Sequence, residues 1–205
     1  MSNFYKENAN GTGDIFLMNV MKKGLFLALA LALVLSACGG GDSPGGAENQ
    51  EIYAEDGYGE GRMGDVIHSY FMDFSVDSAY TAGEYHGHTP PEGKQVLVVG
   101  MTVKNTSKTS LPMYGSDFQA QWTASEETDE YAWPITEGAD GGMLDTVAEE
   151  QLPSEYELRV NESRSGTLVF DVPAGEKDFS ISHQELFDDD TNGDLFFVYF
   201  TAEAA

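Results

Sequence analysis

The sequence predicts an all-β protein with the architecture of an antiparallel β-sandwich. Apolar residues alternate with polar ones along short runs, which is the period of two that a half-buried strand requires. Clusters of Pro, Gly, Asn and Ser separate these runs and predict turns. About seven short strands joined by turns are typical of two sheets packed face to face.

The first expected strand has Tyr70, Met72, Phe74 and Val76 on one face and polar residues on the other. The run Val96–Val103 is rich in β-branched residues, which predicts a strand buried on both faces near the centre of a sheet. Further strands are expected, in chain order, at Phe118–Trp122, Leu168–Val172, Phe179–Ile181 and Leu195–Phe200.

Turn signals lie between the expected strands, at Thr89–Gly93, Asn105–Ser107, Pro173–Gly175 and Asn192–Gly193. The acidic, weakly patterned segment Ser125–Glu150 is expected to be a long excursion between strands, and such excursions are either functional or mobile. A short helical turn is expected only at Thr146–Leu152.

The N-terminal part of the sequence predicts export and attachment to lipid. A basic start at Met21–Lys23 precedes the apolar run Gly24–Leu35, and small residues follow, which is the pattern of a secretory signal. The run is shorter than the roughly 20 residues that a membrane-spanning helix needs, although a transmembrane anchor or a buried helix is the alternative. The tetrad Leu35-Ser36-Ala37-Cys38 resembles the lipobox of bacterial lipoproteins, which implies that Cys38 carries the lipid.

These features divide the chain into consecutive parts. Residues 1–20 are expected to be a spurious or extended leader, because a signal begins with its charged end. Met21 is the true start if this leader is spurious, and Met1 is the true start if the leader is an extension of the protein. Residues 21–37 form the signal peptide, and residues 38–51 form the lipidated Cys38 and a Gly-rich flexible tether. Residues 52–205 form the folded domain, which the lipid would hold at the extracellular face of the cell membrane.

The charge of the chain restricts its partners. With 35 acidic and 10 basic residues, the net charge is −25, which excludes nucleic acid because a phosphate backbone requires a basic surface. Anionic lipid headgroups are disfavoured for the same reason. Cations, cationic peptides and neutral glycans are the expected partners, and the alternative is that the acidity only keeps the protein soluble.

The order of these signals resembles a known family. The residues that carry the resemblance are Pro91–Lys94, Val96–Val99, Thr102–Ser107, Ser116–Phe118 and Ser165–Pro173. Over roughly Gly64 to Phe200 the chain resembles the immunoglobulin-like lipoproteins of Gram-positive bacteria, a family of unknown function whose members are often mislabelled as telomeric-repeat-binding factors. The resemblance implies an immunoglobulin-like β-sandwich, and it brings no catalytic residues with it.

The segment Asp188–Asp194 is the sharpest candidate for a metal site. It begins with the D-x-[DN]-x-[DN]-G pattern of an EF-hand loop, in which alternate residues supply oxygen ligands and the glycine permits a sharp bend. Tyr199 replaces the expected glutamate at the twelfth position, so the segment is not an EF-hand. Calcium binding stays one interpretation, and a hairpin turn with solvated acids is the other. The predicted calcium ligands are Asp188, Asp190, Asn192 and Asp194.

Three weaker motifs each have a structural alternative. His86-Gly87-His88 suggests a metal clip, against which stands an ordinary exposed loop. Gly59–Gly64 matches G-x-G-x-x-G, but no helix is expected after it, so the match reads as coincidence. Tyr131 and Trp133 suggest an aromatic platform for a sugar or peptide, with burial as the alternative, whereas Trp122 is expected in the core.

The sequence favours a binding protein over an enzyme. It has no G-x-S-x-G or H-E-x-x-H motif, and its single cysteine is assigned to lipid. The leading hypothesis is a lipid-anchored, non-enzymatic β-sandwich that binds an extracellular protein or glycan and requires no cofactor. A calcium-stabilised surface module is the second hypothesis, and a cell-envelope enzyme is the third.

Overall fold

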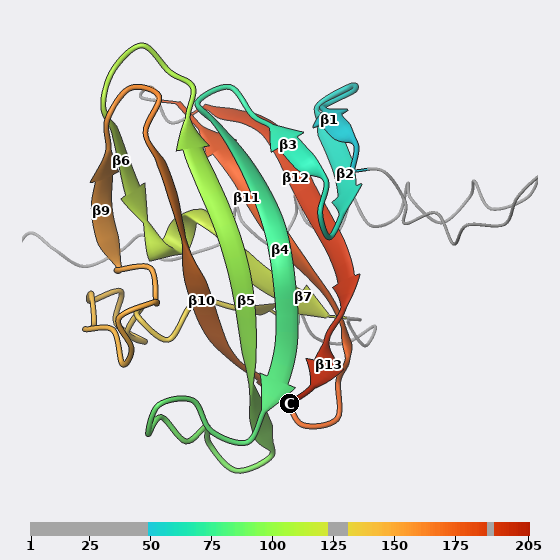
Figure 1. The fold of residues 1–205 in the computed structure, drawn as a ribbon, viewed down its shortest axis with the longest axis vertical. Helices are drawn as coiled ribbons and strands as arrows, with labels where there is room; N and C mark the ends of the chain where they lie inside the picture. The colour runs from blue at the N-terminus through green and yellow to red at the C-terminus, as the bar shows by residue number, and fades with distance from the viewer. Residues whose placement is uncertain (1–48, 123–130, 188–190) are drawn as a thin grey trace, which may run out of the picture. The chain divides into compact units, whose positions relative to one another are not determined.

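The computed structural model describes residues 49–122, 131–187 and 191–205, and these lie within one unit that spans Gly45–Ala205. Nearly all of the regular structure is strand, which confirms the predicted β-sandwich (Figure 1). A single turn of 3-10 helix, η2, spans Gly115–Asp117. None of the helical structure in these three ranges is long and apolar enough to cross a membrane.

The larger sheet has the strand order β1-β3-β4-β5-β10, and β13 pairs with the far end of β4. Its long central strands β4 and β5 run antiparallel, and a register shift between Val76 and Ser78 marks a bulge in β4. The strands of this sheet are β1 (Glu51–Tyr53), β3 (Val66–His68), β4 (Met72–Ala82), β5 (Lys94–Asn105), β10 (Ser163–Pro173) and β13 (Glu203–Ala204).

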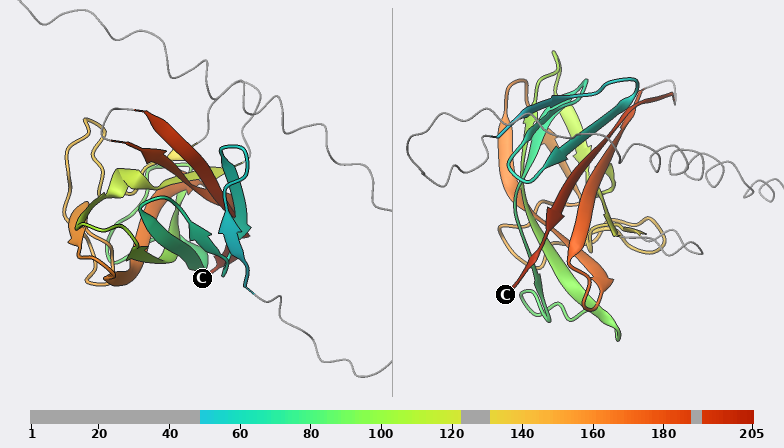
Figure 2. Two further views of the ribbon diagram at one scale, coloured as in Figure 1. Left: turned by 90° about the horizontal axis from the view of Figure 1, so that it is seen from above. Right: turned by 90° about the vertical axis from the view of Figure 1, so that its right-hand side faces the viewer.

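The second sheet has the order β2-β12-β11-β7-β8 and forms the other layer of the sandwich (Figure 2). Its strands are β2 (Tyr58–Arg62), β7 (Gln119–Trp122), β8 (Tyr131–Ala132), β11 (Asp178–Leu186) and β12 (Asn192–Thr201). A separate two-stranded ribbon joins β6 (Leu111–Tyr114) to β9 (Glu155–Leu158). Three pairings at the margins are parallel, namely β1 with β3, β2 with β12, and β13 with β4, whereas the sequence pattern predicted antiparallel pairing alone.

Aromatic side chains from both sheets fill the space between the layers. The ring of Phe74 in β4 lies 5.4 Å from that of Phe118 and 6.4 Å from that of Phe196 in β12, and all three rings are buried. Edge-to-face contacts of this kind stabilise a core beyond the burial of apolar area alone. The alternation of Met72, Phe74 and Val76 therefore marks the inner face of β4, as predicted.

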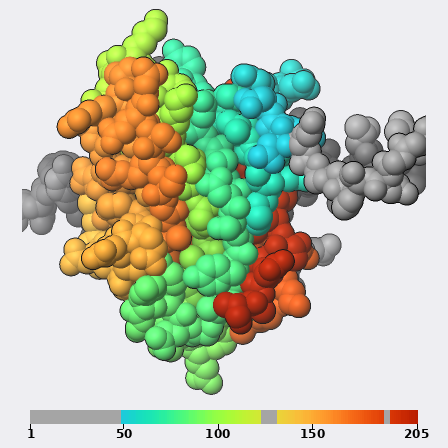
Figure 3. Space-filling view, in the orientation of Figure 1, coloured from blue at the N-terminus to red at the C-terminus, as the bar shows by residue number. Residues whose placement is uncertain are grey.

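Strand β5 is buried on both faces, as its composition predicts. Leu97 and Val99 belong to the main core, whereas Val96 and Val98 form a second apolar cluster on the outer face of the sheet. Ile135, from the excursion between β8 and β9, packs on this outer cluster and its backbone N–H donates to the carbonyl of Val169. In Figure 3 the excursion lies against the larger sheet.

Three local predictions were wrong. The turn expected at Asn192–Gly193 is not observed there, because both residues belong to β12. Tyr70 does not share the buried face of β4: it precedes the strand, in the turn after β3, and is 71% exposed. Thr146–Leu152 forms bends and a turn instead of helix, because Gln151 makes a bridge to Thr167 and the N–H of Leu152 donates to the carbonyl of Thr167. Pairing to the sheet edge at β10 therefore outweighs the weak local preference for a helical turn.

Candidate functional site

A pocket of about 410 Å³ opens at one end of the sandwich, where both sheets contribute to its wall. This volume lies in the range of small-molecule sites. The β1 strand and the β3–β4 turn form one side, and the end of β11 with the start of β12 forms the other. The side chains that line the pocket include Tyr53, His68, Tyr70, Glu185, Phe187 and Asp194.

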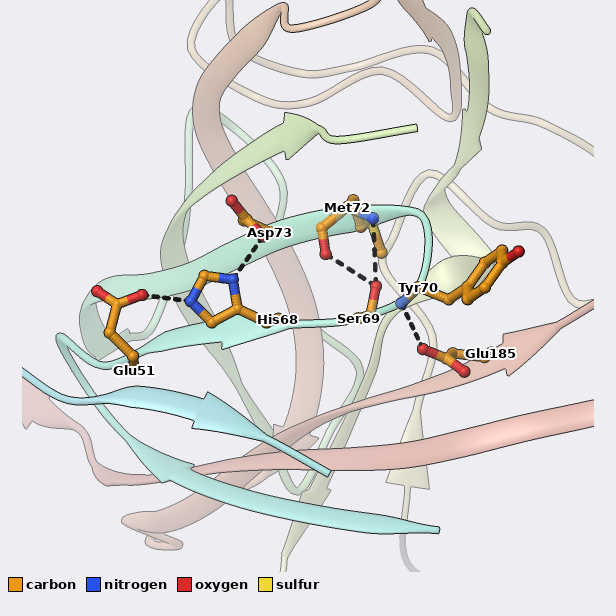
Figure 4. A network of polar contacts seen from close by, with 7 residues as sticks. All are labelled: Glu51, His68, Ser69, Tyr70, Met72, Asp73 and Glu185. Carbon is orange, nitrogen blue, oxygen red and sulfur yellow. Dashed lines mark hydrogen bonds and ion pairs between the residues drawn. The ribbon is translucent and has the colours of Figure 1, made fainter. Parts of the chain in front are cut away.

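His68 joins three strands at the edge of this pocket. Its Nδ1 lies 2.7 Å from Oδ1 of Asp73 in β4, and its Nε2 is hydrogen-bonded to the carboxylate of Glu51 in β1 (Figure 4). The ring of Tyr53 stacks on the imidazole with centroids 4.4 Å apart and planes 11° apart. Burial by itself would lower the pKa of His68, but the hydrogen bonds with Glu51 and Asp73 together raise it above its ordinary value.

The two ring nitrogens of His68 both face carboxylates, and this arrangement limits its chemistry. A general base needs one free ring nitrogen within hydrogen-bond reach of the proton that it removes. In this structure Asp73 occupies one nitrogen and Glu51 the other. The histidine therefore acts as a clamp that holds β1 against β4.

Glu185 is the buried carboxylate of the pocket and is only 3% exposed. Its Oε1 accepts a 2.6 Å hydrogen bond from the backbone N–H of Tyr70 (Figure 4). Its Oε2 accepts a 2.9 Å bond from the N–H of Asp194. A Cβ on Gly193 would lie 2.4 Å from Oε2 of Glu185, so only glycine leaves room for the carboxylate. The carboxylate thus joins the β3–β4 turn to the β11–β12 hairpin.

Aromatic rings form the open rim of the pocket. Tyr70 contacts Phe71 and Phe187 edge-on, with centroid distances of 4.9 and 5.3 Å. Tyr53 is 63% exposed, and with Tyr70 it presents an unusual amount of aromatic surface to solvent. Exposed aromatic surface beside a pocket is typical of a recognition site.

The predicted ligand platform of Tyr131 and Trp133 lies elsewhere on the fold, beside β8. The two side chains are 46% and 44% exposed, and their rings meet edge-to-face with centroids 6.0 Å apart. Trp122 packs against the core, as expected. Whether the platform binds a sugar or a peptide stays a prediction.

Two of the four predicted calcium ligands, Asn192 and Asp194, lie among the described residues. Asp188 and Asp190 lie outside the described residues, as does Cys38, whereas Asn192 begins β12 and Asp194 lines the pocket. Across 49–122, 131–187 and 191–205, no group of three or more His, Cys, Asp or Glu side chains is placed to hold a metal ion. Calcium binding by the Asp188–Asp194 segment stays a prediction.

His86 and His88 do not converge on a common point. Nε2 of His86 lies 2.9 Å from the carboxylate of Glu150, and Nε2 of His88 lies 2.8 Å from that of Asp171. Tyr85 supports the same turn through hydrogen bonds from its hydroxyl to Glu150 and with Thr167. The structure favours the interpretation of His86-Gly87-His88 as a loop, tied to its neighbours by separate contacts.

The glycines of Gly59–Gly64 have a packing role. A Cβ on Gly59 would lie 2.6 Å from the ring of Phe196, and a Cβ on Gly61 would lie 2.7 Å from Cδ1 of Ile67. These glycines belong to the marginal strand β2, and no helix follows them. The G-x-G-x-x-G match is therefore coincidental, as predicted.

Sequence reasoning missed the pocket itself, although one signal for it was present. Phe179, Ile181, His183 and Glu185 occupy alternate positions of β11 and are all buried. A histidine and a glutamate on the apolar face of a strand are costly unless they have partners. That pattern indicates a specific environment, but the partners of Glu185 come from distant segments that local spacing does not reveal.

Several solved structures are similar to the described fold. A candidate lipoprotein (ycdA) of Bacillus subtilis is 17% identical with a TM-score of 0.49, covering 67% of this chain and 38% of its own. An uncharacterised β-sandwich protein of Clostridium difficile is 16% identical with a TM-score of 0.40, covering 78% of this chain and 100% of its own. A candidate lipoprotein of Staphylococcus aureus is 8% identical with a TM-score of 0.41, covering 70% of this chain and 96% of its own.

The levels of identity and structural overlap are too low to carry a functional argument. No curated protein matches the sequence. The family model DUF4352, a domain of unknown function, matches residues 62–192. Since this match covers more than half of the chain and agrees with the resemblance seen in its motifs, the chain belongs to the DUF4352 family.

Proposed function

We propose that this protein is a lipid-anchored, non-enzymatic β-sandwich that binds a ligand outside the cell membrane. The observation that carries the proposal is the pocket between the two sheets, which is lined by the exposed rings of Tyr53 and Tyr70 and by the buried carboxylate of Glu185. A preformed concave site with aromatic walls and few polar groups is the usual form of a ligand site.

The location rests on the N-terminal sequence. A signal of the lipoprotein type directly precedes Cys38, and the Gly-rich segment that follows has the composition of a flexible tether. Two or more acyl chains at Cys38 would anchor the chain durably, and the tether would let the domain move at the membrane surface. Loss of the anchor is therefore expected to release the protein.

We prefer binding to catalysis because the polar side chains of the pocket are already engaged in hydrogen bonds within the protein. Asp73 and Glu51 occupy both nitrogens of His68, and Glu185 accepts hydrogen bonds from two backbone N–H groups. Groups held in this way stabilise a rigid shape, and a rigid shape reduces the entropic cost of binding. The proposal assigns no proton transfer to any of them.

Retention of envelope components by the full-length protein in detergent tests the binding function. Beads carrying wild-type protein are compared with beads carrying the double variant Tyr53→Leu/Tyr70→Leu, and the matched control is Tyr114→Leu, which alters an exposed tyrosine outside the pocket. The proposal expects a component that wild type and control retain and the double variant loses. Equal retention by all three proteins would contradict it.

A calcium-stabilised surface module is the second proposal, and Asp194 is the observation that favours it. This predicted ligand lines the pocket next to Glu185, and both residues supply hard oxygen atoms. Thermal unfolding of the full chain with calcium and with a chelator provides the test. A higher melting temperature in calcium, abolished by Asp190→Asn, supports the proposal, and an unchanged melting temperature contradicts it.

A further inference from the structure

We infer that the pocket recognises an organic ammonium group, held between aromatic rings and the carboxylate of Glu185. The inference rests on the proposed binding function and adds the chemical class of the ligand. It is carried by three features of the pocket: an uncompensated buried acid, aromatic rings at the rim, and a volume suited to a small cationic head.

The first feature is the charge of Glu185. The side chain is 3% exposed, and within the described ranges the four ion pairs are formed by His68, His86 and His88, so none of them involves Glu185. Two backbone N–H groups hold its oxygens, but a neutral donor does not cancel a charge. A buried carboxylate without a cation is costly, so a cationic ligand would be bound strongly there.

The second feature is the aromatic rim. Tyr70 and Phe187 meet edge-to-face at 5.3 Å, and Tyr53, which also lines the pocket, is stacked on His68. The faces of such rings carry partial negative charge and attract ammonium groups, especially substituted ones that lose little hydration on binding. Rings and carboxylate thus favour the same kind of ligand.

The third feature is the volume of the pocket, which together with the negative charge of its wall selects small cations. Asp194 adds a second carboxylate to the wall, and the chain as a whole carries a net charge of −25, so anions are repelled. Among the residues that line the pocket, the one basic side chain is His68, and it already lies between Glu51 and Asp73. A pocket of about 410 Å³ accommodates a trimethylammonium head or the end of a lysine side chain.

Neutral sugars and bare metal ions fit these features less well. A sugar would use the tyrosine faces but would leave the charge of Glu185 uncompensated. A metal ion would use the carboxylates, but the described part of the chain has no set of three ligating side chains, and the aromatic rim would have no role. An organic ammonium group uses both.

Calorimetric titration of the full-length protein, in non-ionic detergent and phosphate buffer free of amines, tests the inference. Choline is compared with 3,3-dimethyl-1-butanol, which has the same shape without the charge. A lysine-containing peptide and its acetyl-lysine counterpart form the second arm, which distinguishes a small molecule from a protein side chain as the source of the ammonium group. The inference expects the charged member of at least one pair to bind roughly tenfold or more tightly than the neutral one.

Two variants and two controls locate the binding. Tyr70→Leu is expected to weaken binding of the charged probe roughly 5- to 30-fold, and Glu185→Gln roughly 10- to 100-fold. Tyr114→Leu and Glu157→Gln alter exposed residues outside the pocket and are expected to leave the affinity unchanged. Because Tyr70 is 71% exposed, its variant remains informative even if Glu185→Gln fails to fold.

The outcomes separate this inference from the proposed function. If the pocket variants lose an envelope component but no charged probe binds the wild type, the inference fails and the binding function stands. If neither experiment depends on the pocket, both fail. Equal binding of choline and its neutral isostere, or tight binding of calcium that excludes choline, also overturns the inference.

Discussion

The backbone N–H of Tyr70 donates a 2.6 Å hydrogen bond to Oε1 of Glu185, a residue 115 positions later in the chain. The other carboxylate oxygen accepts from the N–H of Asp194, so one buried side chain fixes two loops at the mouth of the pocket. Neither loop has a continuous ladder of strand pairing to the other. Their relative position therefore depends on Glu185.

Replacement of Glu185 by alanine is expected to destabilise the fold. The change leaves two backbone N–H groups without their acceptor, and each unsatisfied buried donor costs about 1–3 kcal/mol, so we expect a total loss of about 2–6 kcal/mol. Urea unfolding followed by fluorescence measures the loss. The exposed residue Glu157 supplies the control, since Glu157→Ala is expected to change stability by less than about 0.5 kcal/mol. Equal effects of the two variants would show that Glu185 has no structural role.

Gly61 is expected to resist substitution because β2 packs closely on β3. An added Cβ would lie 2.7 Å from Cδ1 of Ile67, which is buried, so Gly61→Ala is expected to cost about 1–3 kcal/mol. Gly83 is the matched control because its added Cβ has no atom within 4 Å. Thermal unfolding distinguishes the two, and a Gly61→Ala protein as stable as Gly83→Ala would contradict the packing described for β2.

His183 is expected to make the fold less stable in acid. Burial lowers its pKa to about 4, although the hydrogen bond between Nδ1 and the carbonyl of Asp117 partly offsets that effect. The unfolded chain takes up the proton near pH 6.5, before the folded one does, so stability falls as pH drops from 6.5 to 4, by on the order of 3 kcal/mol. Relative to wild type, His183→Gln is expected to gain stability over this interval, as measured by urea unfolding at several pH values.

Asp117 is expected to act in the opposite sense. Burial raises the pKa of its carboxyl to about 6, against a lowering by the hydrogen bond from the N–H of Tyr114. The folded chain then binds the proton first, so this group adds stability as pH falls from about 6 toward 3.8. Relative to wild type, Asp117→Asn is expected to lose stability on acidification from pH 6 to pH 4. Identical pH profiles for wild type and Asp117→Asn would contradict this assignment.

The clamp at His68 is expected to loosen as pH rises. Its pKa lies above the ordinary value, so its stabilising contribution is complete below about pH 6.5 and is lost as pH rises through the folded pKa. Amide hydrogen exchange in β1 is expected to show greater protection at pH 6 than at pH 9, after correction for the intrinsic rate. The variant Glu51→Gln is expected to lower the pKa of His68 in an NMR titration, and an unchanged value would contradict the clamp.

The strands that the sequence predicted correctly are those whose hydrophobic pattern is local. The alternation at Phe74 and Val76 and the β-branched run of β5 have a period that local sequence reveals, and both predictions were confirmed. The short strands β2 and β13 and the ribbon of β6 and β9 were missed. They run parallel at the margins or are only two to five residues long, so pairing with distant strands defines them.

The pocket was hidden for the same physical reason. Tyr70 was expected on a buried face because it lies two positions before Met72, and alternate residues of a strand share a face. The chain turns between the two residues, and the ring of Tyr70 is exposed instead. Glu185 gives a local signal only as an acid on an apolar strand face. Its hydrogen-bond partners, the backbone N–H groups of Tyr70 and Asp194, come from other segments of the chain, so local sequence does not reveal them.

The central claim is that a lipid on Cys38 holds this β-sandwich outside the membrane, where the pocket meets its ligand. Intact-mass and peptide mass spectrometry of the protein from the membrane fraction of the producing cells tests it most directly. We predict a chain that begins at Cys38 and carries diacylglycerol on its sulfur. A protein that retains Met1 or Met21 with an unmodified cysteine would contradict the claim.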